Sequence, residues 1–191
     1  MNERSPAHHE PVAIIGAACR LPGGVDGLDA LWRVLSEGRD LITEAPEERF
    51  DKRWFESADP RRPGKSYTFA GGYLEGAEEW DPGFFGISPR EAARIDPQQR
   101  MALEMAVEAF DDAGVDPALL RGSDTAVQLG VYAHAFGGLQ ARDVTSVDSP
   151  SAMGSAGTAI ANRVSYHFDL RGPSLTVDTA CSSSLITVHQ A

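Results

Sequence analysis

The most regular apolar pattern lies in the middle of the chain. Leu103, Val107 and Phe110 recur at helical spacing after Asp96-Pro-Gln-Gln99, and Gly114 follows them. An Asp-x-x-Gln start with proline in the first turn is typical of a helix N-terminus, and glycine is typical of a C-terminus. The pattern predicts a helix over 97–113 that packs one face into the core.

Further helices follow from the same reasoning. Leu28, Leu31, Trp32 and Leu35 mark one helical face before Gly38, and Ser88-Pro-Arg-Glu91 predicts another helix start. Residues 151–168 also read as one helix, with larger anchors among many small residues. Its two interior glycines cost about 1 kcal/mol each relative to alanine, so we expect another backbone to approach closely there.

Three apolar segments predict strands. Val12-Ala-Ile-Ile15 is closed by Gly16, residues 125–131 alternate, and 175–179 are rich in β-branched residues. Strands that alternate with helices indicate the α/β class. Residues 39–80 are expected to be largely irregular. Within them Gly64-Lys65-Ser66 lacks the earlier glycine and the preceding strand of a phosphate-binding loop, and residues 16–21 lack a dinucleotide fingerprint.

The last predicted strand changes into a helix at Cys181. Ser182, Ser183 and Ser184 can cap free N–H groups, and Leu185 and Val188 then follow helical spacing. Free N–H groups and the positive end of a helix favour thiolate over thiol. The pattern therefore predicts a nucleophile at a strand–turn–helix junction, with a buried structural cysteine as the alternative.

Composition narrows the class of protein. The chain has 191 residues, 42% of them hydrophobic, a net charge of −11 and two cysteines. It predicts one globular α/β domain in the cytoplasm, without a disulfide framework, a metal site or a membrane span. The acidic balance argues against nucleic acid as a partner. Residues 1–10 are polar, lack a signal-peptide core and are expected to form a flexible lead-in.

Three blocks of residues carry a family resemblance. Val177-Asp-Thr-Ala-Cys-Ser-Ser-Ser-Leu185 closely resembles the active-site signature of β-ketoacyl synthases, in the form found in type I polyketide synthases. The segments 11–24 and 81–100 resemble two earlier blocks of the same domain, in the same order. Residues 11–191 are therefore identified as the N-terminal part of a ketosynthase domain, ending shortly after its nucleophile.

The resemblance implies a fold and a reaction. The fold is thiolase-like, with α-β-α-β-α layers built from two similar halves, of which this chain resembles the first. Its mixed sheet would be flanked by helices, with central strands at 12–18 and 125–131. Cys181 is the implied catalytic residue. It would accept an acyl chain and condense it, with loss of CO₂, with a malonyl-type extender on an acyl carrier protein.

The resemblance also implies partners. Phosphopantetheine would belong to the carrier protein, so no cofactor is expected on this domain. The complete domain would form a homodimer alongside other polyketide synthase domains. The family's two enolate-binding histidines stand in His-Gly-Thr-Gly-Thr and Asn-x-Gly-His contexts, and none of the five histidines here is in either context. The 191-residue chain alone is therefore expected to be inactive in condensation.

Three other functions remain open from the residues. A fatty-acid ketosynthase or a thiolase relative would share the fold. A cysteine hydrolase could pair Cys181 with His134, His167 or His189, although no motif orients such a histidine. A non-catalytic dimerisation or interaction role is the third alternative.

Overall fold

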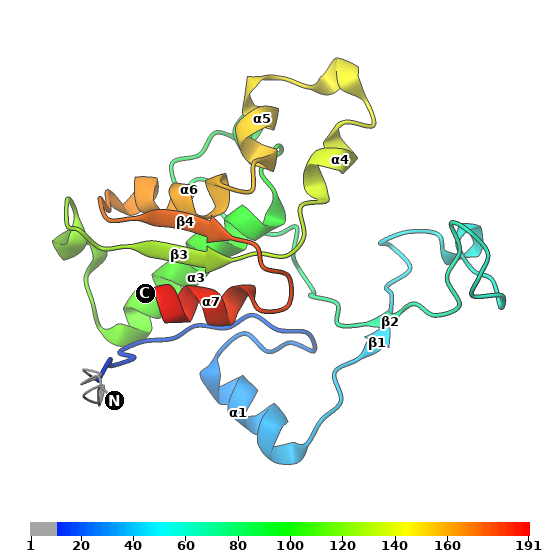
Figure 1. Cartoon of the computed structure of the whole chain (residues 1–191), viewed down its shortest axis with the longest axis horizontal. Helices are drawn as coiled ribbons and strands as arrows, with labels where there is room; N and C mark the ends of the chain where they lie inside the picture. Colours follow the sequence, from blue (N-terminus) through cyan, green and yellow to red (C-terminus); the bar gives the residue numbers. More distant parts are fainter. Residues whose placement is uncertain (1–10) are drawn as a thin grey trace, which may run out of the picture.

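The structure is a computed structural model that describes residues 11–191, so the lead-in expected at residues 1–10 lies outside the described residues. Fourteen short elements follow one another along this part of the chain (Figure 1). They are α1 Leu28–Glu37, β1 Thr43–Glu44, η1 Lys52–Trp54, β2 Ala70–Gly71, α2 Pro89–Ala92, α3 Pro97–Ala113, η2 Pro117–Leu120, β3 Val127–Gly130, α4 Phe136–Gln140, η3 Val144–Ser146, α5 Ser149–Ser155, α6 Ala159–Phe168, β4 Ser174–Val177 and α7 Ser183–Gln190.

Two parallel strands, β3 and β4, form the centre of the fold. Val127 pairs with Ser174 and Gly130 with Val177, and the connection between the strands contains α4, α5 and α6. Figure 1 shows α7 on one side of this pair and α3 with α6 on the other. Strands that alternate with covering helices confirm the α/β class. Both strands lead toward the segment that holds Cys181.

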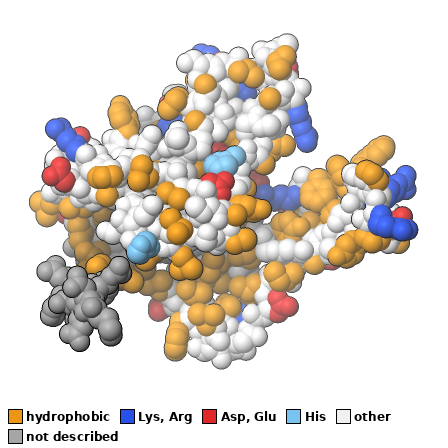
Figure 2. Space-filling view, viewed as in Figure 1, with side chains coloured by type: hydrophobic (Ala, Val, Ile, Leu, Met, Phe, Trp, Pro, Cys, Tyr) orange, Lys and Arg blue, Asp and Glu red, His pale blue; other side chains and the backbone are white. Residues whose placement is uncertain are grey.

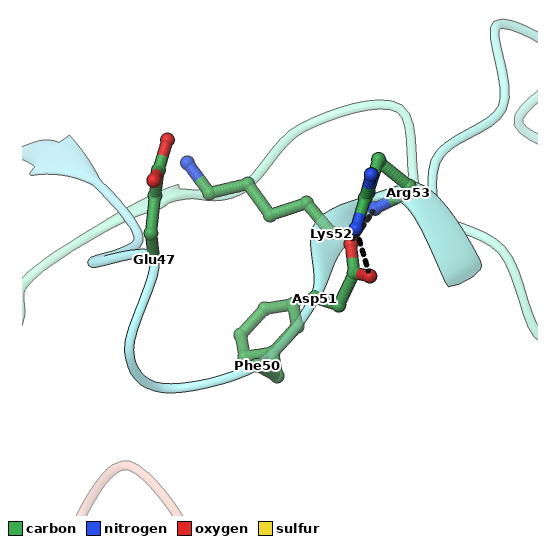
Figure 3. A pocket seen from close by; sticks show the side chains of 5 residues that line it. All are labelled: Glu47, Phe50, Asp51, Lys52 and Arg53. Atoms are coloured by element: carbon green, nitrogen blue, oxygen red, sulfur yellow. Dashed lines mark hydrogen bonds and ion pairs between the residues drawn. The ribbon is translucent and has the colours of Figure 1, made fainter.

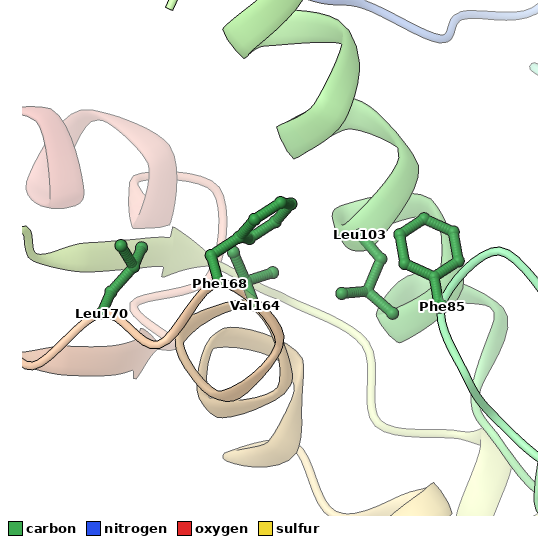
Figure 4. Packing of buried hydrophobic residues seen from close by; sticks show 5 residues of the cluster. All are labelled: Phe85, Leu103, Val164, Phe168 and Leu170. Carbon is green, nitrogen blue, oxygen red and sulfur yellow. The ribbon is translucent and has the colours of Figure 1, made fainter. Parts of the chain in front are cut away.

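The hydrophobic core lies between α3, α6 and the chain before α2. Leu103 is fully buried and contacts a cluster that contains Phe85, Val164, Phe168 and Leu170 (Figure 4). The rings of Phe110 and Phe168 meet edge to face at 5.1 Å between centroids. The predicted helix over 97–113 and its buried face are therefore confirmed. Gly114 ends it with a φ of 63°.

The predicted helix starts at Ser88 and Asp96 are confirmed. Neither forms a capping box, in which the side chain three residues on also bonds back to the N–H of the cap residue. Ser88 Oγ accepts from the N–H of Glu91 and Asp96 accepts from the N–H of Gln98, so both act as N-caps. The bond back to the cap residue is missing at these two helix starts, because the side chain of Glu91 pairs with Arg163 and that of Gln99 is buried against the carbonyl of Gly154. These contacts with residues distant in the sequence replace the local hydrogen bond to the cap residue.

The helix predicted over 151–168 is two helices. Gln99 Nε2 lies within hydrogen-bonding distance of the carbonyls of Met153, Gly154 and Ala156. These contacts bind the carbonyl groups at the C-terminal end of α5, and the helix ends there. Ala156 is extended, with a ψ of 123°, before α6 begins. The expected close backbone approach is confirmed at Gly154, where an added Cβ would collide with the carbonyl of Arg94.

The strand predicted from Val12 is wrong. Residues 11–20 carry no strand assignment, and Val12 and Ile14 are 91% and 89% exposed. The segment instead runs along α3, where the N–H of Ala17 donates to Asp112 Oδ2 at 2.9 Å. A strand needs a neighbour for its backbone groups, and no described segment supplies one here.

Residues 39–80 are largely irregular, as expected, and they extend away from the core on the right of Figure 1. Within this stretch β1 and β2 form an antiparallel pair, and Glu56 and Ser66 form an isolated parallel bridge. Gly64-Lys65-Ser66 forms part of a turn, in which Lys65 Nζ donates to the carbonyl of Trp54 at 2.6 Å. This lysine therefore caps its own loop.

Candidate active site

Cys181 lies in the turn between β4 and α7, as the sequence predicts. Its side chain is exposed, and α7 begins two residues later at Ser183. The preceding residue, Ala180, has a φ of 55°, which residues with a Cβ rarely adopt. Such strain persists only where neighbouring contacts enforce it, and it is concentrated at functional sites.

A set of short polar contacts holds this turn. Ser183 Oγ accepts from the N–H of Thr179 at 2.9 Å and lies 2.7 Å from the carbonyl of Ala180. Asp178 Oδ1 accepts from the N–H of Ala180 at 2.9 Å. Ser182 does not cap the helix with its side chain, contrary to expectation, and donates instead to the carbonyl of Thr179. The side chains of Ser182 and Ser183 therefore stabilise the loop between β4 and α7 and do not cap the N-terminus of α7.

Gly130 brings β3 directly against the start of α7. A Cβ at this position would lie 2.6 Å from the backbone nitrogen of Ser184 and 2.9 Å from its Cα. Real Cβ atoms do not approach backbone so closely, so only glycine fits. The strand pair and α7, the helix that follows Cys181, are therefore packed backbone to backbone at Gly130.

His134 lies beside this turn. It follows β3, and its Nε2 lies 3.3 Å from Asp178 Oδ2, with both side chains partly exposed. Its ring occupies the space next to Gly157, where an added Cβ would meet the imidazole at 2.7 Å. From the sequence, His134 was one of three possible hydrolase partners of Cys181, and no pattern linked it to Asp178. The signal that links it to Asp178 is that both residues follow parallel strands.

The other described histidines lie elsewhere. His167 packs edge-on against Phe85, and burial together with the charge of Arg121 lowers the pKa of His167 below its ordinary value. His189 is exposed near the end of α7. Within residues 11–191, no hydrogen bond joins Cys181 to a histidine, so the Cys–His pair of a hydrolase is not formed there.

A cavity elsewhere among the described residues is lined in part by groups that already pair with each other. A cavity of about 640 Å³ lies over Glu47, Phe50, Asp51, Lys52 and Arg53, where Arg53 is already paired with Asp51 (Figure 3). Cys19 is half-buried in the N-terminal segment. In the part of the chain that the structure describes, no group of His, Cys, Asp and Glu is arranged to hold a metal ion. No helix there has the length and apolarity to cross a membrane.

Several exposed apolar side chains lie on α7 and near it. Figure 2 shows hydrophobic side chains over the face that carries α7 and the N-terminal segment. Leu185 and Val188 on α7 are each 75% exposed, and Ile15 and Trp32 are 70% and 72% exposed. The apolar faces predicted from the sequence therefore exist, but several of them face outward.

The family comparison matches nearly the whole chain. Residues 9–191 match the family described as "Beta-ketoacyl synthase, N-terminal domain". The chain belongs to the β-ketoacyl synthase family. Its relatives include Erythronolide synthase EryA2 of Saccharopolyspora erythraea, which is 48% identical over 95% of this chain and 5% of its own length. A polyketide synthase GfsB of Streptomyces halstedii is 49% identical over 95% of this chain and 3% of its own.

Solved ketosynthases have the same fold. An oxazolomycin ketosynthase domain of Streptomyces albus superimposes with a TM-score of 0.83 and 40% identity, over 93% of this chain and 30% of that one. A ketosynthase from the bacillaene synthase of Bacillus subtilis gives a TM-score of 0.76 and 31% identity, over 94% and 28%. The ketosynthase chain described here therefore carries the N-terminal half of a thiolase-like fold and spans less than a third of these neighbours.

Proposed function

We propose that this ketosynthase uses Cys181 to accept an acyl chain during polyketide assembly. The observation that carries the proposal is the exposed thiol in a strained turn that opens α7. The N–H of Cys181 has no hydrogen-bond partner within the described residues, so it is free to donate to a developing oxyanion. The positive end of α7 adds a field that favours negative charge at this place.

The first step is a thioester exchange. The Cys181 thiolate attacks the thioester carbonyl of an acyl-phosphopantetheine arm, and a tetrahedral oxyanion forms. Its collapse breaks the carbon–sulfur bond to the arm, which leaves as a thiolate and takes up a proton. The acyl group remains on Cys181 as a new thioester, so the step needs neither an oxidant nor a metal.

The second step extends the chain. A malonyl-type extender on an acyl carrier protein loses CO₂, and its carbanion attacks the acyl group on Cys181 and releases the thiolate. The product is a β-ketoacyl chain longer by two carbons. The two histidine contexts that the resemblance assigns to this step do not occur in the printed sequence. We assign acylation, and not decarboxylation, to the 191-residue chain.

The proposal includes partners. The acyl carrier protein would deliver both thioesters on its phosphopantetheine arm, and the complete domain would form a homodimer alongside other polyketide synthase domains. Gly157, one of the two interior glycines of residues 151–168, lies against the side chain of His134 of the same chain and not against another backbone. A dimer contact in this region would therefore use the outer face of α6, where Tyr166 is 88% exposed.

Acyl transfer to the purified chain tests the proposal. The chain is incubated with an acyl N-acetylcysteamine thioester, a small mimic of the arm, and mapped by peptide mass spectrometry. We expect one acyl group on Cys181, none in Cys181→Ala, and no CO₂ from malonyl-carrier protein above the no-protein control. Turnover of the thioester to free acid, with no acyl-enzyme detected, would instead support a hydrolase.

A further inference from the structure

The ends of the two central strands bring a histidine and an aspartate together. His134 comes four residues after β3 and Asp178 comes directly after β4. Because the strands are parallel, the segments that follow them begin at the same end of the strand pair, where both strands have their C-termini (Figure 1). His134 Nε2 and Asp178 Oδ2 lie 3.3 Å apart there, which is ion-pair distance for a protonated imidazole.

The aspartate connects this histidine to the nucleophile's turn. One oxygen of Asp178 faces His134, and the other accepts from the N–H of Ala180 at 2.9 Å. Ala180 is the residue with a φ of 55° immediately before Cys181. A single carboxylate thus joins the imidazole to the strained backbone that aims the thiol.

The surroundings of His134 leave Asp178 as its partner. Gly157, between α5 and α6, offers no side chain and makes room for the ring. On α3, Gln98 Nε2 donates to the carbonyl of Ala133, the residue before His134, at 2.9 Å. The same amide contacts the carboxylate of Asp96, so Asp96 already has a partner. Among residues 11–191, the one charged group within ion-pair distance of His134 is Asp178.

We propose that His134 is a positioning residue for Cys181, acting through Asp178. When protonated, its imidazole pairs with the carboxylate and holds it against the N–H of Ala180, which keeps the turn in the conformation that presents the thiol. His134 is not a general base in this arrangement, because it faces Asp178 and has no hydrogen bond to Cys181. The inference rests on the proposed role of Cys181 as the nucleophile.

The test compares rates of Cys181 acylation by an acyl N-acetylcysteamine thioester across pH. His134→Gln removes the charge at similar size, and Asp178→Asn removes the opposite charge while it keeps an oxygen for the N–H of Ala180. Histidines exchange their proton between about pH 5 and 8. We expect each variant to react about two- to fivefold more slowly than the unchanged chain at pH 6. At about pH 8.5 the loss should disappear in His134→Gln and become smaller in Asp178→Asn, whose amide oxygen still accepts more weakly from the N–H of Ala180. The double variant should be no slower than the slower single variant.

The outcomes separate this inference from the function on which it rests. Equal rates at pH 6, additive losses in the double variant, or a loss of the same size at every pH would overturn the role of His134. If Cys181 of the unchanged chain is acylated no faster than Cys19, the nucleophile itself is wrongly assigned. Near-ultraviolet circular dichroism checks the fold of each variant. Asp178→Asn, which replaces one oxygen by an amide group, carries the comparison if His134→Gln unfolds.

Discussion

Gln99 Oε1 accepts a hydrogen bond of 2.9 Å from Arg163 Nε, although Gln99 is completely buried. Its Nε2 faces the carbonyls that end α5, and Arg163 also pairs with Glu91 at 2.8 Å. One amide thereby joins α3, α5 and α6 in the layer that supports the strand pair. Buried polar groups of this kind are costly when one partner is removed.

Replacing this amide should destabilise the fold strongly. We expect Gln99→Leu to lower the free energy of unfolding by about 2–3 kcal/mol, because it removes the hydrogen bonds of Gln99 with the carbonyls at the end of α5 and with Arg163 Nε. Urea unfolding followed by circular dichroism measures the change. Gln190→Leu, at an exposed position on α7, is the matched control and should shift the midpoint little. Similar midpoints for the two variants would contradict the assigned role of Gln99.

Two glycines in short helices should respond in opposite ways to alanine. At Gly154 an added Cβ meets the backbone of Arg94, whereas at Gly138 in α4 nothing lies within 4 Å. We expect Gly154→Ala to destabilise the chain by about 1–3 kcal/mol through overpacking. Gly138→Ala should stabilise it by about 0.5–1 kcal/mol through helix propensity and a less flexible unfolded chain. Thermal unfolding of both variants checks the order, and a loss of stability in Gly138→Ala would refute it.

The two cysteines should differ in reactivity. Cys181 is exposed in its turn, whereas Cys19 is half-buried beside α3. Limiting iodoacetamide followed by peptide mass mapping should therefore modify Cys181 first. Cys19→Ser should leave the rate of labelling unchanged, and Cys181→Ser should remove the fast phase. Faster modification of Cys19 would count against the assignment.

Mild acid should destabilise the chain through His167. Its pKa lies below the ordinary value of 6.5, chiefly because of burial, so the unfolded chain binds the proton more tightly than the folded chain. This contribution to stability is fully present above pH 6.5 and is lost as the pH falls from there toward the lowered pKa. His167→Phe keeps an aromatic ring against Phe85 and should flatten the pH dependence of the urea midpoint between pH 7.5 and 5. The exposed His189→Gln should leave it unchanged.

Local sequence signals predicted the elements that their own residues stabilise. Gly38 and Gly114 both adopt the left-handed conformation expected at helix ends, with a φ of 63° in each case. The helix over 97–113 follows from its apolar spacing and from Pro97. Cys181 was placed at a strand-to-helix turn because the composition changes abruptly at that residue. Such features depend on neighbours a few positions away, so one sequence contains them.

Tertiary contacts decided the features that the sequence did not predict. The break after Ser155 depends on Gln99, which lies more than fifty residues earlier, and no local pattern announces it. Residues 12–15 have the composition of a buried strand, but a strand also needs a second strand beside it for its backbone hydrogen bonds. The link between His134 and Asp178 exists only because β3 and β4 are parallel neighbours. Long-range geometry of this kind cannot be read from periodicity.

The left-handed conformation of Ala180 has a consequence for how many shapes the turn can adopt. Glycine would occupy a φ of 55° without strain, but it would also open regions of backbone space that alanine cannot enter. With alanine, the backbone of the turn has few alternative conformations once Asp178 and Ser183 hold it. In the proposed acylation, the methyl group of Ala180 would therefore act without touching the substrate, by limiting the backbone conformations in which a thioester meets Cys181.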